Sequence, residues 1–188
     1  MKKIKDFNIH KELINGCLHG DRLAQSETYR LYYKAMYNTC LRLINDRVEA
    51  EDVMQEAFLS AFQKIRTYSN VMSFGSWLKK IVINRSIDFL RANKIKFEAL
   101  NEKTEYPDAS EKDFCINEEK DAAIKVERIK KAVEELPEGF RIVLILALFE
   151  GYDHGEIAMI LNISESTSRS QLARAKKKLV EYLNKKEK

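Results

Sequence analysis

The stretch DHGEIAMILNISESTSRSQLARAKKKL, residues 153–179, predicts a short helix, a tight turn and a longer second helix. Asp153 and Glu156 have the spacing of a capping box, in which two side chains satisfy backbone amides at the start of a helix. Ser164 can cap the second helix in a similar way. Ala158 is a small residue where the two helices approach, so the stretch has the pattern of a helix-turn-helix.

The second helix is basic on its outward face, which suits the surface of duplex DNA. Residues 169–188 hold eight basic and two acidic side chains. Short polar and Arg side chains near the start of such a helix can reach base edges in the major groove, and later Lys side chains can meet phosphates. The last three lysines fit a solvated helix end instead. We expect DNA contacts from Ser166, Arg169, Ser170, Arg174, Lys176 and Lys177, and an inward stripe of Ser168, Leu172, Ala175, Leu179 and Leu183.

The composition of the whole chain points to an all-α protein. Its 188 residues include 45% apolar and 33% charged side chains and carry a net charge of +4, which argues against wholesale disorder and against a membrane protein. Only six Gly and two Pro interrupt long stretches at helical spacing. The longest apolar run, residues 142–149, is too short to cross a bilayer, and the basic N-terminus lacks the apolar segment of a signal peptide. We therefore expect no direct membrane insertion and a cytoplasmic location.

Signatures of common enzyme classes are missing from the sequence. The phosphate-binding patterns GxxxxGK and GxGxxG are absent, as are HExxH and GxSxG. Three widely spaced cysteines, Cys17, Cys40 and Cys115, form no CxxC pair, and we interpret them as free thiols. Cys17 and Cys40 together with His19 match no zinc spacing. These absences weaken the case for catalysis without excluding it. We predict no catalytic residue, no metal site and no cofactor, and we expect that the chain is not an enzyme.

Charge divides the chain into three parts. Residues 1–92 carry a net charge of +5, residues 93–120 of −3 and residues 121–188 of +2. The middle part contains Pro107, eight carboxylates and little apolar periodicity, which is typical of a solvated linker. We predict two small helical domains, residues 1–92 and 121–188, joined by the acidic linker 93–120. In the second domain the apolar run lies on one helix that ends near Gly151.

One predicted helix of the first domain has two contrasting faces. Its apolar face carries Val53, Met54, Ala57, Phe58, Ala61, Phe62 and Ile65, which we assign to the core. Its opposite face aligns Asp52, Gln55, Glu56 and Leu59 on one exposed ridge, because residues three and four apart are neighbours on a helix. A further helix, from about Ser76 to Ala92, follows a short segment at residues 67–75.

Several motifs stand in one order across both domains. They are Asp46, AEDVMQEAF at 50–58, FGSWL at 74–78, Asn84, DFLR at 88–91, ELPE at 135–138, EGY at 150–152 and EIA at 156–158. Together they resemble the sigma-70 family, specifically its minimal extracytoplasmic-function (ECF) group. The resemblance covers nearly the whole chain outside the linker, and several motifs in order are far more specific than a helix-turn-helix alone.

The resemblance implies a factor that lends promoter specificity to RNA polymerase. In such sigma factors an acidic-amide helix docks on the clamp coiled coil of core RNA polymerase, and Asp52, Gln55 and Glu56 match its positions. An exposed carboxylate row with Leu59 suits a basic partner helix. The second domain resembles the reader of the minus-thirty-five element, with Arg169, Ser170 and Arg174 at positions that commonly contact DNA.

The resemblance also implies promoter opening by the first domain. Family members capture an unstacked base of the minus-ten element in a pocket between a loop and the following helix, and the matching loop is residues 67–75. Polar loop groups can read a flipped base, and cations can steer the single strand. We interpret Phe74 and Trp77 as packing residues. The predicted minus-ten contacts are Ser69, Asn70, Lys79, Lys80, Asn84 and Arg85.

Two positions depart from the family pattern, and one further partner is implied. Ser168 stands where an apolar residue of the inward stripe is usual, and Gln171 stands where a basic residue is frequent, so the hydrogen bonds to DNA are expected to differ. The family implies regulation by sequestration. An anti-sigma factor, linked to the membrane, is therefore an expected partner beside core RNA polymerase and promoter DNA.

Two other hypotheses remain open from the sequence. The first is an ordinary helix-turn-helix regulator whose N-terminal domain senses a ligand or dimerises, which leaves the ridge at Gln55 unexplained. The second is a helical metal-dependent hydrolase that uses Glu49, Asp52 and Glu56. Helical metal sites normally draw their ligands from several facing helices, whereas these three carboxylates share one helix.

Overall fold

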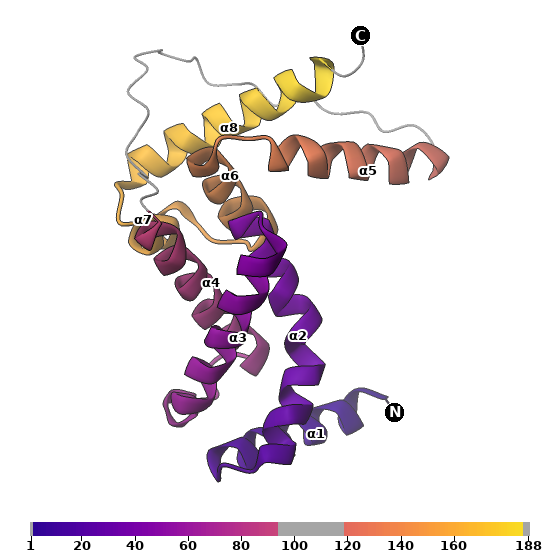
Figure 1. The fold of residues 1–188 in the computed structure, drawn as a ribbon, viewed down its shortest axis with the longest axis vertical. Helices are drawn as coiled ribbons and strands as arrows, with labels where there is room; N and C mark the ends of the chain where they lie inside the picture. The colour runs from indigo at the N-terminus through magenta and orange to yellow at the C-terminus, as the bar shows by residue number, and fades with distance from the viewer. Residues whose placement is uncertain (1, 94–118, 186–188) are drawn as a thin grey trace. The chain divides into compact units, whose positions relative to one another are not determined.

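The structure is a computed structural model that describes residues 2–93 and 119–185 (Figure 1). The chain divides into two compact units, Met1–Asn93 and Lys94–Lys188, here the N-terminal unit and the C-terminal unit. Every regular element in the described ranges is a helix, which confirms the predicted all-α class. The predicted linker, residues 93–120, lies almost entirely outside the described residues, and so does Cys115.

The N-terminal unit is built from four α-helices. They are α1 (Lys2–Leu18), α2 (Arg22–Ile44), α3 (Arg47–Gln63) and α4 (Phe74–Ala92), with a 3₁₀ turn at Ile65–Thr67 after α3. Helices α2, α3 and α4 each pack against the other two, and α1 packs against α2 (Figure 1). The predicted apolar face of α3 is confirmed, because Val53, Met54, Ala57, Phe58 and Ala61 are buried and Phe62 is half-buried. Ile65, assigned to the same face, is also buried but lies in the 3₁₀ turn after α3.

Short polar side chains decide where these helices begin. The Asp46 carboxylate accepts hydrogen bonds from the amides of Val48 and Glu49, and so caps α3. Ser73 caps α4, since its Oγ accepts from the amide of Ser76 at 3.1 Å. Helix α4 therefore begins at Phe74, two residues before the start predicted from periodicity.

The C-terminal unit is arranged around its last helix. Its elements are α5 (Glu119–Glu134), α6 (Glu138–Leu144), a π-helical segment (Ile145–Phe149), α7 (His154–Leu161) and α8 (Glu165–Lys185), and α8 packs against α5, α6 and α7. The predicted capping box is confirmed, with Asp153 accepting from the amide of Glu156 at 2.8 Å and Glu156 accepting from that of Asp153 at 3.0 Å. The turn and the start of α8 are also as predicted, since Ser164 Oγ accepts from the amide of Thr167 at 3.0 Å.

The sequence predicted one helix for the apolar run, and this prediction was wrong. The run does not form one regular helix. The α-helix ends at Leu144 and widens into the π-helical segment, where the Glu150 amide donates to the Ile145 carbonyl at 3.1 Å. Gly151, with a φ of 78°, then turns the chain away. In the π turn, Ile145 and Leu146 are buried, whereas Leu148 and Phe149 are exposed. The second half of the run therefore lies partly in the core and partly at the surface.

No helix within residues 2–93 or 119–185 combines the length and the apolar character that a membrane crossing needs.

Candidate nucleic-acid interface

The ridge predicted on α3 lies at the surface of the N-terminal unit. Asp52, Gln55, Glu56 and Leu59 are all exposed, and Leu59 keeps 64% of its accessible area. The Gln55 amide donates to Glu51 Oε1 at 3.5 Å, one turn earlier on the same helix. A carboxylate row with one exposed leucine presents both an ionic and an apolar contact to a basic partner.

The segment between α3 and α4 is a closed loop with an exposed tip. The Tyr68 hydroxyl donates to the carbonyl of Met72 at 2.9 Å, across four residues. Asn70 takes a left-handed conformation with a φ of 58°, which turns the chain at the tip. Ser69 and Asn70 are exposed, and Val71 is 86% exposed. The loop therefore displays its short polar groups and one apolar side chain.

An aromatic cluster packs against the base of this loop. The ring centroids of Tyr68, Phe74 and Trp77 lie 5.4 to 5.5 Å from one another. The ring of Tyr32 meets Phe74 at 5.4 Å, and its hydroxyl is 2.9 Å from Nδ1 of His10. Phe74 is buried and Trp77 is half-buried, in agreement with packing roles. The cluster joins the loop to α2 and α4.

The predicted minus-ten residues on α4 follow the loop directly. Lys80, Asn84 and Arg85 are exposed, and Lys79 is half-buried. The Arg85 guanidinium bonds to the carboxylate of Glu56, with Nη2 at 2.8 Å from Oε2. The structure therefore brings together two residues that the sequence had assigned to different partners.

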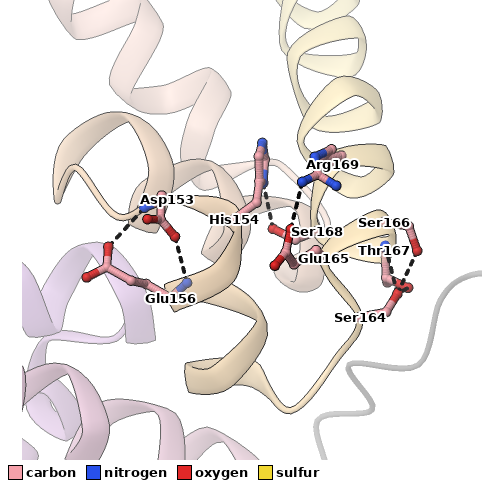
Figure 2. Close-up of polar contacts among 9 residues, drawn as sticks. All are labelled: Asp153, His154, Glu156, Ser164, Glu165, Ser166, Thr167, Ser168 and Arg169. Carbon is pink, nitrogen blue, oxygen red and sulfur yellow. Dashed lines mark hydrogen bonds and ion pairs between the residues drawn. The ribbon is translucent and has the colours of Figure 1, made fainter.

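The start of α8 carries the predicted DNA-facing groups of the C-terminal unit (Figure 2). Ser166, Arg169 and Ser170 are exposed, as are Lys176 and Lys177 farther along the helix, whereas Arg174 is half-buried. The Arg169 guanidinium pairs with Glu165 Oε2 at 2.7 Å (Figure 2). Exposed pairs of this kind contribute little and open readily, so Arg169 can exchange this carboxylate for a DNA group.

A polar contact joins the two helices of the helix-turn-helix. Figure 2 shows the ring of His154, at the start of α7, pointing to Ser168 of α8, with 2.9 Å between Nδ1 and Oγ. Ser168 is fully buried, so its hydroxyl needs a partner inside the unit. The sequence had placed Ser168 in the inward stripe but had missed His154 as its partner. A serine among inward apolar positions was the available signal.

One expectation about α8 was wrong. Gln171 is only 5% exposed, so it lies on the inward side of the helix and does not take the place of a DNA-contacting basic residue. Ser168 and Ala175 are buried with it, and the three leucines of the predicted stripe are half-buried. Compared with the predicted stripe, the buried face of α8 is shifted toward Gln171. The reason is that three helices, α5, α6 and α7, pack against α8.

Two of the three thiols lie in the interior of the N-terminal unit. Cys17 and Cys40 are buried and free, and Cys17 Sγ lies 3.4 Å from Thr28 Oγ1. The Ser86 hydroxyl donates to Cys40 Sγ at 3.5 Å, and burial raises the pKa of the Cys40 thiol to about 11. Among the described residues no His, Cys, Asp and Glu side chains gather in a group of three or more suited to a metal ion.

Comparison with known proteins identifies the family. A model described as Sigma-70 region 2 matches residues 28–95, and one described as Sigma-70, region 4 matches residues 126–179. The ECF RNA polymerase sigma factor SigM of Bacillus subtilis (strain 168) is 31% identical over 162 residues, which cover 84% of this chain and 94% of that protein. The chain belongs to the sigma-70 family, in its ECF group. The ECF RNA polymerase sigma factor SigW of the same organism is 28% identical over 181 residues, or 92% of this chain and 96% of that protein.

Two solved structures share the fold. One is CnrH in complex with the cytosolic domain of CnrY, with a TM-score of 0.53 and 19% identity over 94% of this chain and 97% of that one. The other is the sigma factor RpoE of Bartonella quintana in complex with the anti-sigma factor NepR, with a TM-score of 0.56 and 20% identity over 85% and 96%.

The family assignment decides among the three hypotheses drawn from the sequence. Both units match regions of RNA polymerase sigma factors, which favours neither an ordinary helix-turn-helix regulator nor a metal-dependent hydrolase. The α3 ridge, the loop and α4 fall within the region 2 match, and the start of α8 falls within the region 4 match. Each candidate surface therefore lies inside a matched region of the family.

Proposed function

We propose that this chain is an ECF sigma factor that binds core RNA polymerase and directs it to promoters. Residues 1–92 bind polymerase and open the minus-ten element, residues 121–188 read the minus-thirty-five element, and residues 93–120 link them. The chain performs no chemistry itself and acts in the cytoplasm, where polymerase and promoter DNA lie. The observation that carries the proposal is family membership joined to the exposure of most of the matching side chains on each unit.

Three surfaces divide this work. The α3 ridge of Asp52, Gln55, Glu56 and Leu59 holds polymerase through its carboxylates and exposed leucine. The tip of the loop, with Ser69 and Asn70, captures an unstacked base, while Lys79, Lys80, Asn84 and Arg85 of α4 hold the single strand. Helix α8 enters the major groove with Ser166, Arg169 and Ser170 at its start, and Arg174, Lys176 and Lys177 contact the backbone.

An anti-sigma factor is the expected regulator. The solved sigma factor from Bartonella quintana was crystallised with one, and this chain shares its fold. A protein that covers the α3 ridge or the start of α8 would prevent binding of polymerase or of DNA. We propose sequestration of this kind as the route by which the chain is controlled.

The proposal is tested with purified bacterial core RNA polymerase. The tagged chain is used to pull down the polymerase, and the complex is then given a library of genomic fragments for run-off transcription. Binding together with new, discrete start sites is expected, and the start sites yield the promoter sequence. Sequence-specific duplex binding without any polymerase binding would contradict the proposal and indicate a stand-alone regulator.

A further inference from the structure

One ion pair joins two proposed surfaces of the N-terminal unit. Arg85 of α4 donates two hydrogen bonds to Oε2 of Glu56 in α3, from Nε at 3.1 Å and from Nη2 at 2.8 Å. The two side chains are 49% and 57% exposed, so partners from solution can reach both. Glu56 belongs to the ridge for polymerase and Arg85 to the surface for minus-ten DNA. Each of the two surfaces therefore contributes one charge to the same ion pair.

We infer that this pair couples the two binding events. Glu56 withholds Arg85 from DNA in the free chain, and a basic group of polymerase that pairs with Glu56 releases Arg85 for a phosphate of the single strand. The inference rests on the proposed function, since it takes from there the partners of Glu56 and Arg85. It predicts that the free chain binds single-stranded DNA less tightly than the polymerase-bound chain does.

The geometry makes the two roles of Arg85 compete. A guanidinium presents its N–H groups as a rigid planar fork that pairs with one carboxylate or one phosphate at a given edge. The edge formed by Nε and Nη2 is the one that Glu56 occupies. A phosphate that uses this edge has to displace the carboxylate. By linkage, DNA that holds Arg85 also favours a cation at Glu56 by the same factor.

The size of the coupling follows from the exposure of the pair. Both side chains are about half exposed, and exposed ion pairs shift an equilibrium by no more than about fivefold. A coupling of that size is reversible, which suits a contact that has to open each time polymerase binds. It biases the order of binding toward polymerase first and DNA second, without forbidding the opposite order.

A matched pair of variants in the full-length chain tests the inference without polymerase. Glu56→Gln removes the partner of Arg85, while Asp52→Asn removes an equal charge from the same exposed ridge, one turn earlier, and leaves the ion pair intact. The probe is oligothymidylate, which offers single-stranded phosphates without sequence information. Quenching of Trp77 reports its binding, because the chain has one tryptophan and it lies at the start of α4.

The expected result is a difference between the two carboxylate variants. Glu56→Gln should bind oligothymidylate about two- to fivefold more tightly than Asp52→Asn, because only the first frees Arg85. Its salt dependence should be steeper, since each added phosphate contact on a single strand changes the logarithmic slope by about 0.7. With Arg85→Gln added to both variants, the two affinities should become equal.

Three outcomes would overturn the inference. They are equal affinities of the two carboxylate variants, a difference that persists after Arg85→Gln, and no quenching of Trp77 by oligothymidylate in either variant at low salt. The polymerase pull-down with the unaltered chain tests the proposed function separately. A chain that binds polymerase but shows no effect at Glu56 refutes the coupling alone.

Discussion

Tyr68 closes the loop before α4 through one hydroxyl group. That group donates to the carbonyl of Met72 at 2.9 Å, while the ring packs on Phe74 and Trp77. Tyr68→Phe keeps the ring contacts and removes only the hydrogen bond, whose net contribution is about 0.5 to 1.5 kcal/mol. We expect the variant to lower promoter opening by about two- to tenfold, as measured by run-off transcription from a duplex promoter.

The matched control for this prediction lies in the same aromatic cluster. Tyr32→Phe also removes a hydroxyl group, but that group pairs with His10 and makes no bond to the loop. Both variants should bind core polymerase as the unaltered chain does, because neither residue lies on the α3 ridge. An equal loss of promoter opening in the two variants would show that the Tyr68 hydrogen bond has no specific role.

The Cys40 thiol predicts a loss of stability at alkaline pH. Burial raises its pKa from an ordinary value of 9.0 to about 11. Between these values the unfolded chain has released the proton and the native chain still holds it, so the free energy of unfolding falls as pH rises. The slope reaches about 1.4 kcal/mol per pH unit for one such group.

Urea unfolding followed by Trp77 fluorescence measures this effect in the N-terminal unit. Cys40→Ala should be less stable at neutral pH, because Cys40 is fully buried and its removal leaves a cavity. Its stability should then fall less steeply than that of the unaltered chain between pH 9.0 and about 11. Parallel pH curves for the two proteins would contradict the assignment of this slope to Cys40.

At the scale of elements, the helix-turn-helix is held by caps within each helix and by the packing of α7 on α8, which includes a hydrogen bond between His154 and Ser168. His154→Ala leaves the fully buried hydroxyl of Ser168 without its imidazole partner. An orphaned buried hydroxyl costs about 1 to 3 kcal/mol, so the C-terminal unit should lose stability by that amount. Far-ultraviolet circular dichroism in urea measures the loss, and Trp77 fluorescence confirms that the N-terminal unit is unchanged.

A second substitution distinguishes the hydrogen bond from the packing of the imidazole ring. Adding Ser168→Ala to His154→Ala removes the orphaned hydroxyl, and part of the stability should return. If the double variant is as unstable as the sum of the two single variants, the two side chains are not coupled across the turn.

At the scale of the whole molecule, the proposed surfaces for polymerase and for the minus-thirty-five element lie on different units. Arg169→Ala should weaken promoter binding by about five- to 150-fold and leave polymerase binding intact, because a bidentate base contact is worth about 1 to 3 kcal/mol. Gln55→Ala combined with Leu59→Ala should weaken polymerase binding and leave duplex binding intact. Glu56 is left unchanged in this variant, because loss of its ion pair with Arg85 could also alter DNA binding.

Pull-down of core polymerase and duplex binding by the full chain measure the two activities in parallel. Because the two sets of substitutions lie on different units, their effects should add. Loss of both activities in either variant, with the fold preserved, would contradict the assignment of these surfaces.

Local patterns were sufficient to predict the all-α class, α3, most of α4, the helix-turn-helix and much of the candidate surfaces. The ridge of Asp52, Gln55, Glu56 and Leu59 follows from helical spacing, and the structure leaves all four exposed. The capping box at Asp153 and the cap at Ser164 mark the two helix starts of the helix-turn-helix, and in each the bonded residues are three positions apart. Such features depend on hydrogen bonds and side chains close in sequence, so one-dimensional reasoning can find them.

Contacts between distant residues required the tertiary structure. Arg85 meets Glu56 across 29 positions and His154 meets Ser168 across 14, and no periodicity relates such pairs. Gln171 was misplaced because the inward face of α8 depends on three helices that pack around it. Sequence therefore determined the helical class, the helix-turn-helix and the charged face of α3, since these follow from local spacing and capping. Packing alone decided which charges pair between helices, because such an ion pair exists only once the helices are side by side.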